Sequence, residues 1–261
     1  MTESFREFER RGWEKAAPAY SGFSDVTSGT VEALLAATET GRGARALDVA
    51  TGPGIVARAA RARGARTVGV DFSRSMAALA RSVTDVVVGD VDALPFAKAS
   101  FDVALCNFGL LHFGSPERAL GEIARVLAPG GRAALSVWAG PDTNLFFGAV
   151  YRAIEKNAPR RPDVPPAPAF FHFADEARFR GLLAGAGLGD VAIERVGWKA
   201  RVASARSMVD LFLEGSVRTA AILRAQDAST LERITASIEQ EIAPCAGAVP
   251  VAALVARGRK G

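Results

Sequence analysis

From Ala44 onward the chain alternates short apolar stretches with longer amphipathic stretches. The apolar stretches have the length and composition of buried strands, and the amphipathic stretches carry apolar residues at helical spacing. Because such alternation is typical of parallel sheets with right-handed crossover connections, it predicts an α/β fold. The expected strands are 46–49, 67–70, 85–88, 101–106 and 133–137, and the expected helices between them are 54–63, 74–81 and 116–127, the last one stopped by Pro129, Gly130 and Gly131.

Further elements are expected on both sides of this alternating region. Two helices precede it, and a mixture of helices and strands follows it. The expected helices are 4–17, 28–40, 175–186, 205–215 and 218–241, and the expected strands are 190–202 and 248–256.

The stretch from Ala46 to Ala57 combines an apolar strand, a glycine turn and the start of a helix. Gly52 and Gly54 have no Cβ, so the backbone can turn sharply there and lie directly against a ligand. The helix that follows presents free N–H groups at its first turn. This combination predicts a binding site for a nucleotide-type ligand.

The glycine turn by itself leaves two ligands open. The pattern Gly52-x-Gly54-x-x-Ala57 fits the dinucleotide fingerprint, and Asp71 follows at the distance expected of a ribose-binding acid. Asp48, however, ends the first strand, where a carboxylate would repel a pyrophosphate and attract a cationic ligand. Asp48 therefore favours S-adenosylmethionine, which carries a sulfonium and an amino group, over NAD or NADP.

Composition and charge narrow the class of protein. A chain of 261 residues with 49% hydrophobic content suits one α/β domain, 1–261, with insertions. The charged N-terminus and the lack of an apolar run of ~20 residues predict a soluble, cytoplasmic protein with no membrane span. Two cysteines make neither a disulfide framework nor a metal cluster. The net charge of +4 comes from scattered arginines, so a small-molecule substrate is expected rather than nucleic acid, with a homodimer left open.

With these motifs taken in order, the chain resembles the class I S-adenosylmethionine-dependent methyltransferases, and among them the ubiquinone and menaquinone biosynthesis methyltransferases. The resemblance implies a Rossmann-like sheet of seven strands in the order 3-2-1-4-5-7-6, with the seventh antiparallel. Ala50 stands where the family usually has its first glycine, and a methyl group is tolerated there if φ is negative. The stretches that carry the resemblance are 47–54, 69–76, 89–96, 100–103, 107–113 and 125–131.

The resemblance also implies cofactor-binding roles. Asp71 would accept hydrogen bonds from the ribose, although a helix cap is the alternative, and Asp90 would accept one from the adenine amino group. Phe72 and Met76 would wall the adenine, although their spacing also suits core residues. The remaining implied cofactor residues are Asp48, Ala50, Thr51, Gly52, Gly54, Val91 and Asn107, together with Trp13 and Tyr20 from the N-terminal segment.

Three segments are expected to cover the cofactor as a helical cap: 1–40, 140–173 and 203–247. The second is rich in aromatic residues, which predicts an apolar or aromatic acceptor pocket or, alternatively, packing of the cap on the sheet. His112 is the better of two candidate bases, with a buried structural histidine as the alternative. The aromatic and histidine residues of the second segment are Phe146, Phe147, Tyr151, Phe170, Phe171, His172 and Phe173.

The sequence therefore predicts an S-adenosylmethionine-dependent methyltransferase that acts on an oxygen, carbon or nitrogen atom of a small organic acceptor. An NAD(P)-dependent oxidoreductase and a non-catalytic ligand-binding protein of the same fold are the alternatives.

Overall fold

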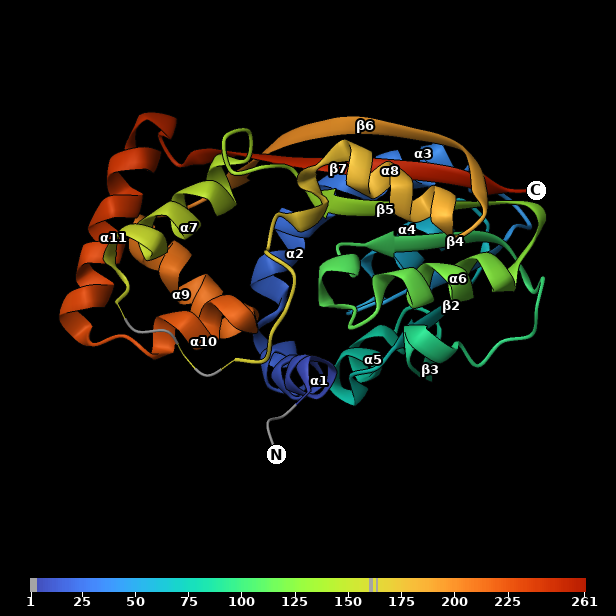
Figure 1. The fold of residues 1–261 in the computed structure, drawn as a ribbon, viewed down its shortest axis with the longest axis horizontal. Coiled ribbons are helices and arrows are strands. Elements are labelled where there is room, and N and C mark those ends of the chain that lie inside the picture. The colour runs from blue at the N-terminus through green and yellow to red at the C-terminus, as the bar shows by residue number, and fades with distance from the viewer. Residues whose placement is uncertain (1–3, 160–161, 163) are drawn as a thin grey trace.

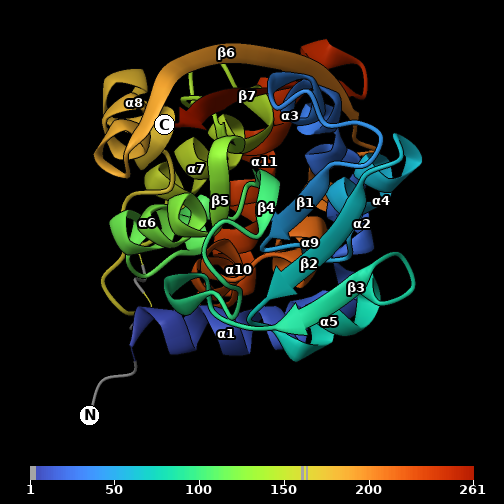
Figure 2. The same cartoon turned by 90° about the vertical axis from the view of Figure 1, so that its right-hand side faces the viewer.

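A computed structural model describes residues 4–159, 162 and 164–261. Its centre is one sheet of seven strands in the order β3-β2-β1-β4-β5-β7-β6, in which β7 runs antiparallel to both of its neighbours and the other pairings are parallel (Figures 1 and 2). The predicted order and the antiparallel seventh strand are confirmed. The strands are β1 (Arg45–Val49), β2 (Arg66–Asp71), β3 (Asp85–Val88), β4 (Phe101–Asn107), β5 (Leu127–Trp138), β6 (Leu188–Arg201) and β7 (Ala248–Lys260).

Helices cover both faces of this sheet. Side chains of α6 and α8 form one core with the sheet, and side chains of α3 and α4 form another on the opposite face (Figure 2). The longer helices are α1 (Phe5–Ala16), α2 (Ser21–Thr27), α3 (Val31–Ala37), α4 (Ile55–Ala62), α5 (Arg74–Ala80), α6 (Pro116–Val126), α7 (Leu145–Asn157), α8 (Glu176–Gly185), α9 (Ala205–Gly215), α10 (Arg218–Arg224) and α11 (Ala228–Ile242).

The central strands are buried on both faces, which explains their nearly continuous apolar sequences. In β4, Ala104 and Cys106 enter the core beneath α6 and α8, whereas Val103 and Leu105 enter the core beneath α3 and α4. This alternation is the two-residue period of a strand. It leaves the carboxyl ends of the strands as the edge at which polar residues can meet a ligand.

A third core lies beyond that edge, among the helices at one end of the molecule (Figure 1). Helix α11 packs against α7 and α9, and α9 also contacts α2. The largest side chains of this core include Phe146, Phe147 and Phe212, which are almost completely buried. Several of the aromatic residues of the segment 140–173 therefore hold these helices together.

Several predicted elements need correction. The expected helix 218–241 is two helices, because Asp227 caps a new helix by accepting a hydrogen bond from the Thr230 backbone. The segment 28–40 begins with a 3-10 turn, and helix α2 before it was not predicted. Helix α6 ends at Val126, and β5 already begins at Leu127, so the sequence 129–131 lies inside a strand rather than stopping a helix. Among the described residues, no helix is long and apolar enough to span a membrane.

Candidate functional site

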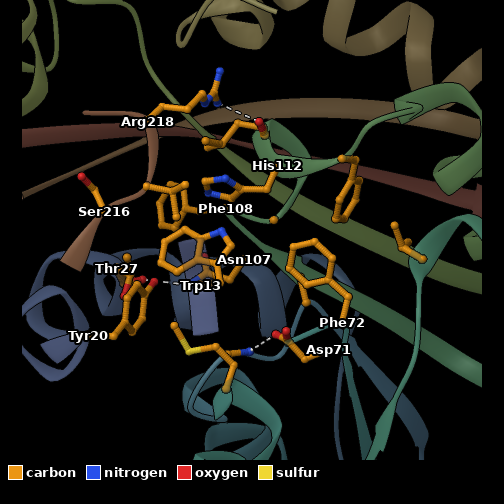
Figure 3. A pocket seen from close by; sticks show the side chains of 18 of the residues that line it. Trp13, Tyr20, Thr27, Asp71, Phe72, Asn107, Phe108, His112, Ser216 and Arg218 are labelled. Atoms are coloured by element: carbon orange, nitrogen blue, oxygen red, sulfur yellow. Dashed lines mark hydrogen bonds between the residues drawn. The ribbon is translucent and has the colours of Figure 1, made fainter. Parts of the chain in front are cut away.

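A large cavity lies at the carboxyl ends of β1, β2 and β4 and next to α1. It holds about 1190 Å³ of space, part of it open to solvent. One end is lined by the glycine turn and by acidic residues, and the other end by aromatic side chains from the helical core. Figure 3 shows Asp71 and Phe72 at one end, His112 and Trp13 in the middle and Arg218 on the far side.

The glycine turn after β1 has three residues with left-handed backbone conformation. Gly52 has φ +51° and Gly54, which precedes α4, has φ +84°. Ala50 has φ +53°, so the predicted condition of a negative φ is not met. Because an alanine in this conformation costs roughly 1–2 kcal/mol, the turn is strained at the position where the family usually has glycine.

Gly109, in the loop after β4, makes room for Ala50. A Cβ atom added at Gly109 would lie 2.7 Å from the Ala50 methyl group and 2.8 Å from Cys106 Sγ. Real atoms do not approach so closely, so the Ala50 methyl group and Cys106 Sγ together leave room only for glycine at position 109. The alanine at position 50 thus faces a glycine at position 109.

Asp71 lies at the end of β2 and faces the cavity. Its Oδ2 accepts a hydrogen bond from the Gly52 N–H at 2.9 Å, and its Oδ1 accepts one from the Ser73 N–H at 2.9 Å. Ser73, not Asp71, caps helix α5, so the alternative role of Asp71 as the helix cap is wrong. Burial raises the pKa of Asp71 to about 6, because the charged carboxylate has lost much of its water.

Asp48 lies beneath the turn rather than on the cavity wall. Its Oδ2 accepts hydrogen bonds from Thr51 Oγ1 at 2.6 Å and from the Ala57 N–H at 3.0 Å. Burial raises its pKa to about 7, and the nearby charge of Asp71 adds to the shift. Thr51 and Gly54 are likewise not among the cavity-lining residues, so the structure gives these three a role in shaping the turn.

The other predicted site residues are brought together around the cavity. Asn107 lines the cavity, but its side-chain amide is hydrogen-bonded within the protein. Its Oδ1 accepts hydrogen bonds from Thr30 and Ser136, and its Nδ2 donates one to the Thr27 carbonyl. Asp90 forms an ion pair with Arg6 of α1. The full set of predicted residues on the cavity wall is Trp13, Tyr20, Ala50, Gly52, Asp71, Phe72, Met76, Asp90, Val91, Asn107 and His112.

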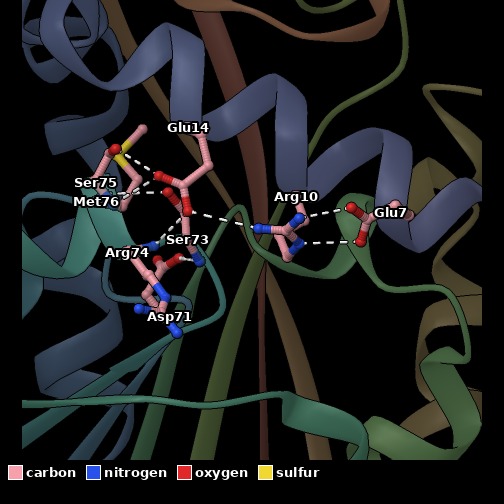
Figure 4. Close-up of polar contacts among 8 residues, drawn as sticks. All are labelled: Glu7, Arg10, Glu14, Asp71, Ser73, Arg74, Ser75 and Met76. Atoms are coloured by element: carbon pink, nitrogen blue, oxygen red, sulfur yellow. Dashed lines mark hydrogen bonds and ion pairs between the residues drawn. The ribbon is translucent and has the colours of Figure 1, made fainter.

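Sequence reasoning missed the residues by which α1 holds the site. Glu9 is completely buried, and its Oε2 lies 2.8 Å from His112 Nδ1. Glu14 accepts hydrogen bonds from the backbone N–H groups of Arg74 and Ser75 and thereby caps helix α5, which directly follows Asp71 (Figure 4). A signal for Glu9 was present: it occupies the same helical face as Phe5 and Trp13, where an acid needs a partner.

Part of the chain that forms this cavity is similar in sequence to known methyltransferases. A methyltransferase domain model matches residues 47–135, which run from β1 into β5. A demethylmenaquinone methyltransferase of Thermus thermophilus is 42% identical over 117 residues, which are 41% of this chain and 53% of that protein. One from Paenarthrobacter aurescens is 30% identical over 178 residues, which are 64% of this chain and 70% of that protein. This chain spans about half the length of the first of these relatives.

A solved structure shares the fold across nearly the whole chain. It is an S-adenosylmethionine-dependent methyltransferase from Thermotoga maritima, described as a possible histamine N-methyltransferase, with a TM-score of 0.57 and 20% identity. The alignment covers 97% of this chain and all of the other one. With these relatives, the sheet order and the glycine turn found together, the chain belongs to the S-adenosylmethionine-dependent methyltransferase family.

Proposed function

We propose that this protein transfers a methyl group from S-adenosylmethionine to a small aromatic acceptor. The observation that supports this most directly is the continuity of the cavity, which joins the acidic carboxyl edge of the sheet to a chamber of aromatic rings. A methyl transfer needs both reactants in one enclosed space and in line. Such positioning contributes about 7–11 kcal/mol without further chemistry, because sulfonium is already an activated donor.

The residues at the polar end fit the cofactor. A Cβ added at Gly52 would meet nothing within 4 Å, so the backbone there is open to a ligand. Each oxygen of Asp71 accepts one backbone hydrogen bond and keeps a lone pair for a ribose hydroxyl. Phe72 and Met76 would enclose the adenine, with Asp90 and the backbone of Val91 at its edge. When bound, the cofactor supplies the methyl group and a thioether leaving group.

The aromatic end fits a flat, apolar acceptor. Trp138 stacks on Phe108 with ring centroids 3.6 Å apart, and Phe147 lies against the other side of this pair at 4.1 Å from Trp138. Phe170 continues the same wall toward Tyr151. The two relatives named above are demethylmenaquinone methyltransferases, which supports a quinone-type ring as the acceptor. In this proposal His112, between the two ends, serves as the base.

Isothermal titration with S-adenosylhomocysteine, S-adenosylmethionine, NADH and NADPH tests the cofactor. We expect the first two to bind at micromolar concentration and the nicotinamide cofactors not to bind. Incubation with tritium-labelled S-adenosylmethionine and reduced demethylmenaquinone then tests transfer. Binding of NADH without a response to either sulfur ligand would overturn the proposal. Tight binding of S-adenosylmethionine without transfer to any hydroxylated, amino or carbon acceptor would favour a non-catalytic ligand-binding protein.

A further inference from the structure

His112 is held by a carboxylate that comes from a different part of the chain. The two residues are 103 positions apart, and His112 Nδ1 lies 2.8 Å from Glu9 Oε2. The Trp13 indole N–H donates to the same Glu9 oxygen at 3.1 Å, and its ring packs edge-on against the imidazole at 4.9 Å. Glu9 is fully buried, whereas the His112 side chain keeps 22% of its surface exposed. The pair thus points from the protein interior toward the cavity that His112 lines.

Arg218, at the start of α10, supplies the counter-charge for Glu9. Its Nε lies 3.2 Å from Glu9 Oε1. Its other nitrogens donate to the carbonyl groups of Leu111 at 2.8 Å and of Pro168 at 2.9 Å. A carboxylate paired with a guanidinium can only accept hydrogen bonds.

This arrangement determines which imidazole nitrogen carries the proton. Because Glu9 can only accept, neutral His112 must donate from Nδ1, and the lone pair is then on Nε2. Among the described residues, Nε2 has no hydrogen-bond partner. The other charged side chains that line the same cavity are Arg6, Asp71, Asp90 and Asp92. None of them pairs with the imidazole.

We propose that Glu9 is a positioning residue that holds His112 as a base, and that the acceptor is therefore a hydroxyl-bearing aromatic ring. This inference rests on the proposed function and names its substrate class. A hydroxyl on an aromatic ring is a poor nucleophile until its proton is removed, whereas a thiolate or a neutral aromatic amine attacks through a lone pair that is already free. Those acceptors therefore gain little from an oriented, neutral imidazole.

Methyl transfer to this acceptor moves one proton and one methyl group. His112 Nε2 takes the hydroxyl proton, and the acceptor oxygen forms the new bond to the methyl carbon. The bond between that carbon and the sulfonium sulfur breaks, and its electron pair stays on sulfur as a neutral thioether. The imidazolium then returns its proton to water. If the carbon next to the ionised hydroxyl attacks instead, the ring later loses the hydrogen of that carbon as a proton.

The first test needs no substrate, because the chain has only two histidines. Nitrogen-15 NMR of the labelled protein, assigned with the variant His172→Gln, reports the tautomer of His112. We expect the Nδ1–H form in the wild type and in Glu7→Gln, a matched control on the exposed side of the same helix. In Glu9→Gln the amide can donate to Nδ1, so the Nε2–H form should appear. A wild type in the Nε2–H form would overturn the proposal.

The second test separates a base from a structural histidine. The probes are 2-naphthol and 2-naphthalenethiol, since the thiol ionises near neutral pH without help. In single-turnover assays at pH 7, His112→Ala should slow methylation of the naphthol by about 100-fold or more, and Glu9→Gln by about tenfold or more. Methylation of the thiol should change less than about threefold. Added imidazole should restore part of the naphthol rate in His112→Ala.

Each other outcome has a definite meaning. Equal losses on both probes, with no rescue by imidazole, would make Glu9 and His112 merely structural and overturn the inference. Unchanged naphthol rates in both variants would do the same. If the wild type fails to bind S-adenosylhomocysteine in the titration, the proposed function itself fails, and the NMR result on Glu9 and His112 is unaffected by that failure.

Discussion

The methyl group of Ala50 occupies the space that a side chain at Gly109 would need, so the glycine turn after β1 and the loop after β4 are matched to each other. Ala50 adopts φ +53°, and Gly109 is the residue that allows the methyl group to face the loop. This relationship couples two segments that line the same cavity. It also predicts how the stability of the protein changes when Ala50 is replaced by glycine and Gly109 by alanine.

Ala50→Gly should stabilise the protein by up to about 1 kcal/mol, because glycine adopts positive φ without strain. Gly109→Ala should destabilise it by about 1–3 kcal/mol through overlap with Ala50 and Cys106. In the double variant, part of the second loss should be recovered. Urea unfolding of the four proteins measures the coupling between the positions. Strictly additive changes would mean that the two segments adjust independently.

Asp71→Asn should weaken binding of S-adenosylhomocysteine at least about tenfold. The change removes the negative charge that strengthens hydrogen bonds from the ribose hydroxyls, each worth roughly 1.5–3 kcal/mol. Isothermal titration measures the change, and Asp85→Asn, at the exposed start of β3, is the control. Normal binding by Asp71→Asn would show that Asp71 serves only the turn, through its bonds to Gly52 and Ser73.

The stability of the fold should depend on the protonation of Asp48. Its pKa is about 7 in the folded chain against an ordinary value of 3.8, so the folded state binds the proton more tightly. The resulting stabilisation is complete below pH 3.8 and is lost as the pH rises through about 7, at a rate of about 1.4 kcal/mol per pH unit at most.

Asp48→Asn removes this titration and keeps an oxygen for Thr51 and Ala57. The stability of the wild type, relative to this variant, should therefore fall between pH 5 and about pH 7 and then stay level. Urea unfolding at several pH values measures the difference. A difference that does not change with pH would contradict the assignment of the titration to Asp48. Because the pKa of Asp71 is also raised, the stability of both the wild type and Asp48→Asn should fall further as the pH rises to about 6.

We expect α1 and the two insertions to close over the ligands. Hydrogen exchange in residues 8–24, 141–173 and 203–245 should slow when S-adenosylhomocysteine and an aromatic acceptor are both present; residues 160, 161 and 163 of the second segment lie outside the described residues. The N-terminal helix is the most informative segment, since Glu9 and Glu14 connect it to His112 and to α5. If the glycine turn gains protection while these three segments do not, the insertions are not a lid and an interface between copies of the chain becomes the better interpretation.

The parts of the fold that local sequence patterns specify were predictable, and those that depend on distant pairs were not. Strands β1 to β5 follow from apolar runs and their alternation, and the ligand edge follows from the topology. The pairing of Glu9 with His112 and Arg218 joins three segments, so no local pattern contains it. Likewise, part of the need for glycine at 109 comes from the methyl group of Ala50, which is far away in the sequence. The split of the expected helix 218–241 depends on the single cap at Asp227.

Helix α1 places three side chains against the ends of three different strands. Arg6 pairs with Asp90 after β3, Glu9 with His112 after β4, and Glu14 with the start of α5 after β2. Successive residues of a helix are rotated by about 100° around its axis. The insertion or deletion of one residue between Arg6 and Glu14 therefore breaks at least one of these contacts. These three contacts therefore fix the number of residues between Arg6 and Glu14. The residues on the outer side of α1 can be substituted, but the helix cannot be lengthened or shortened there.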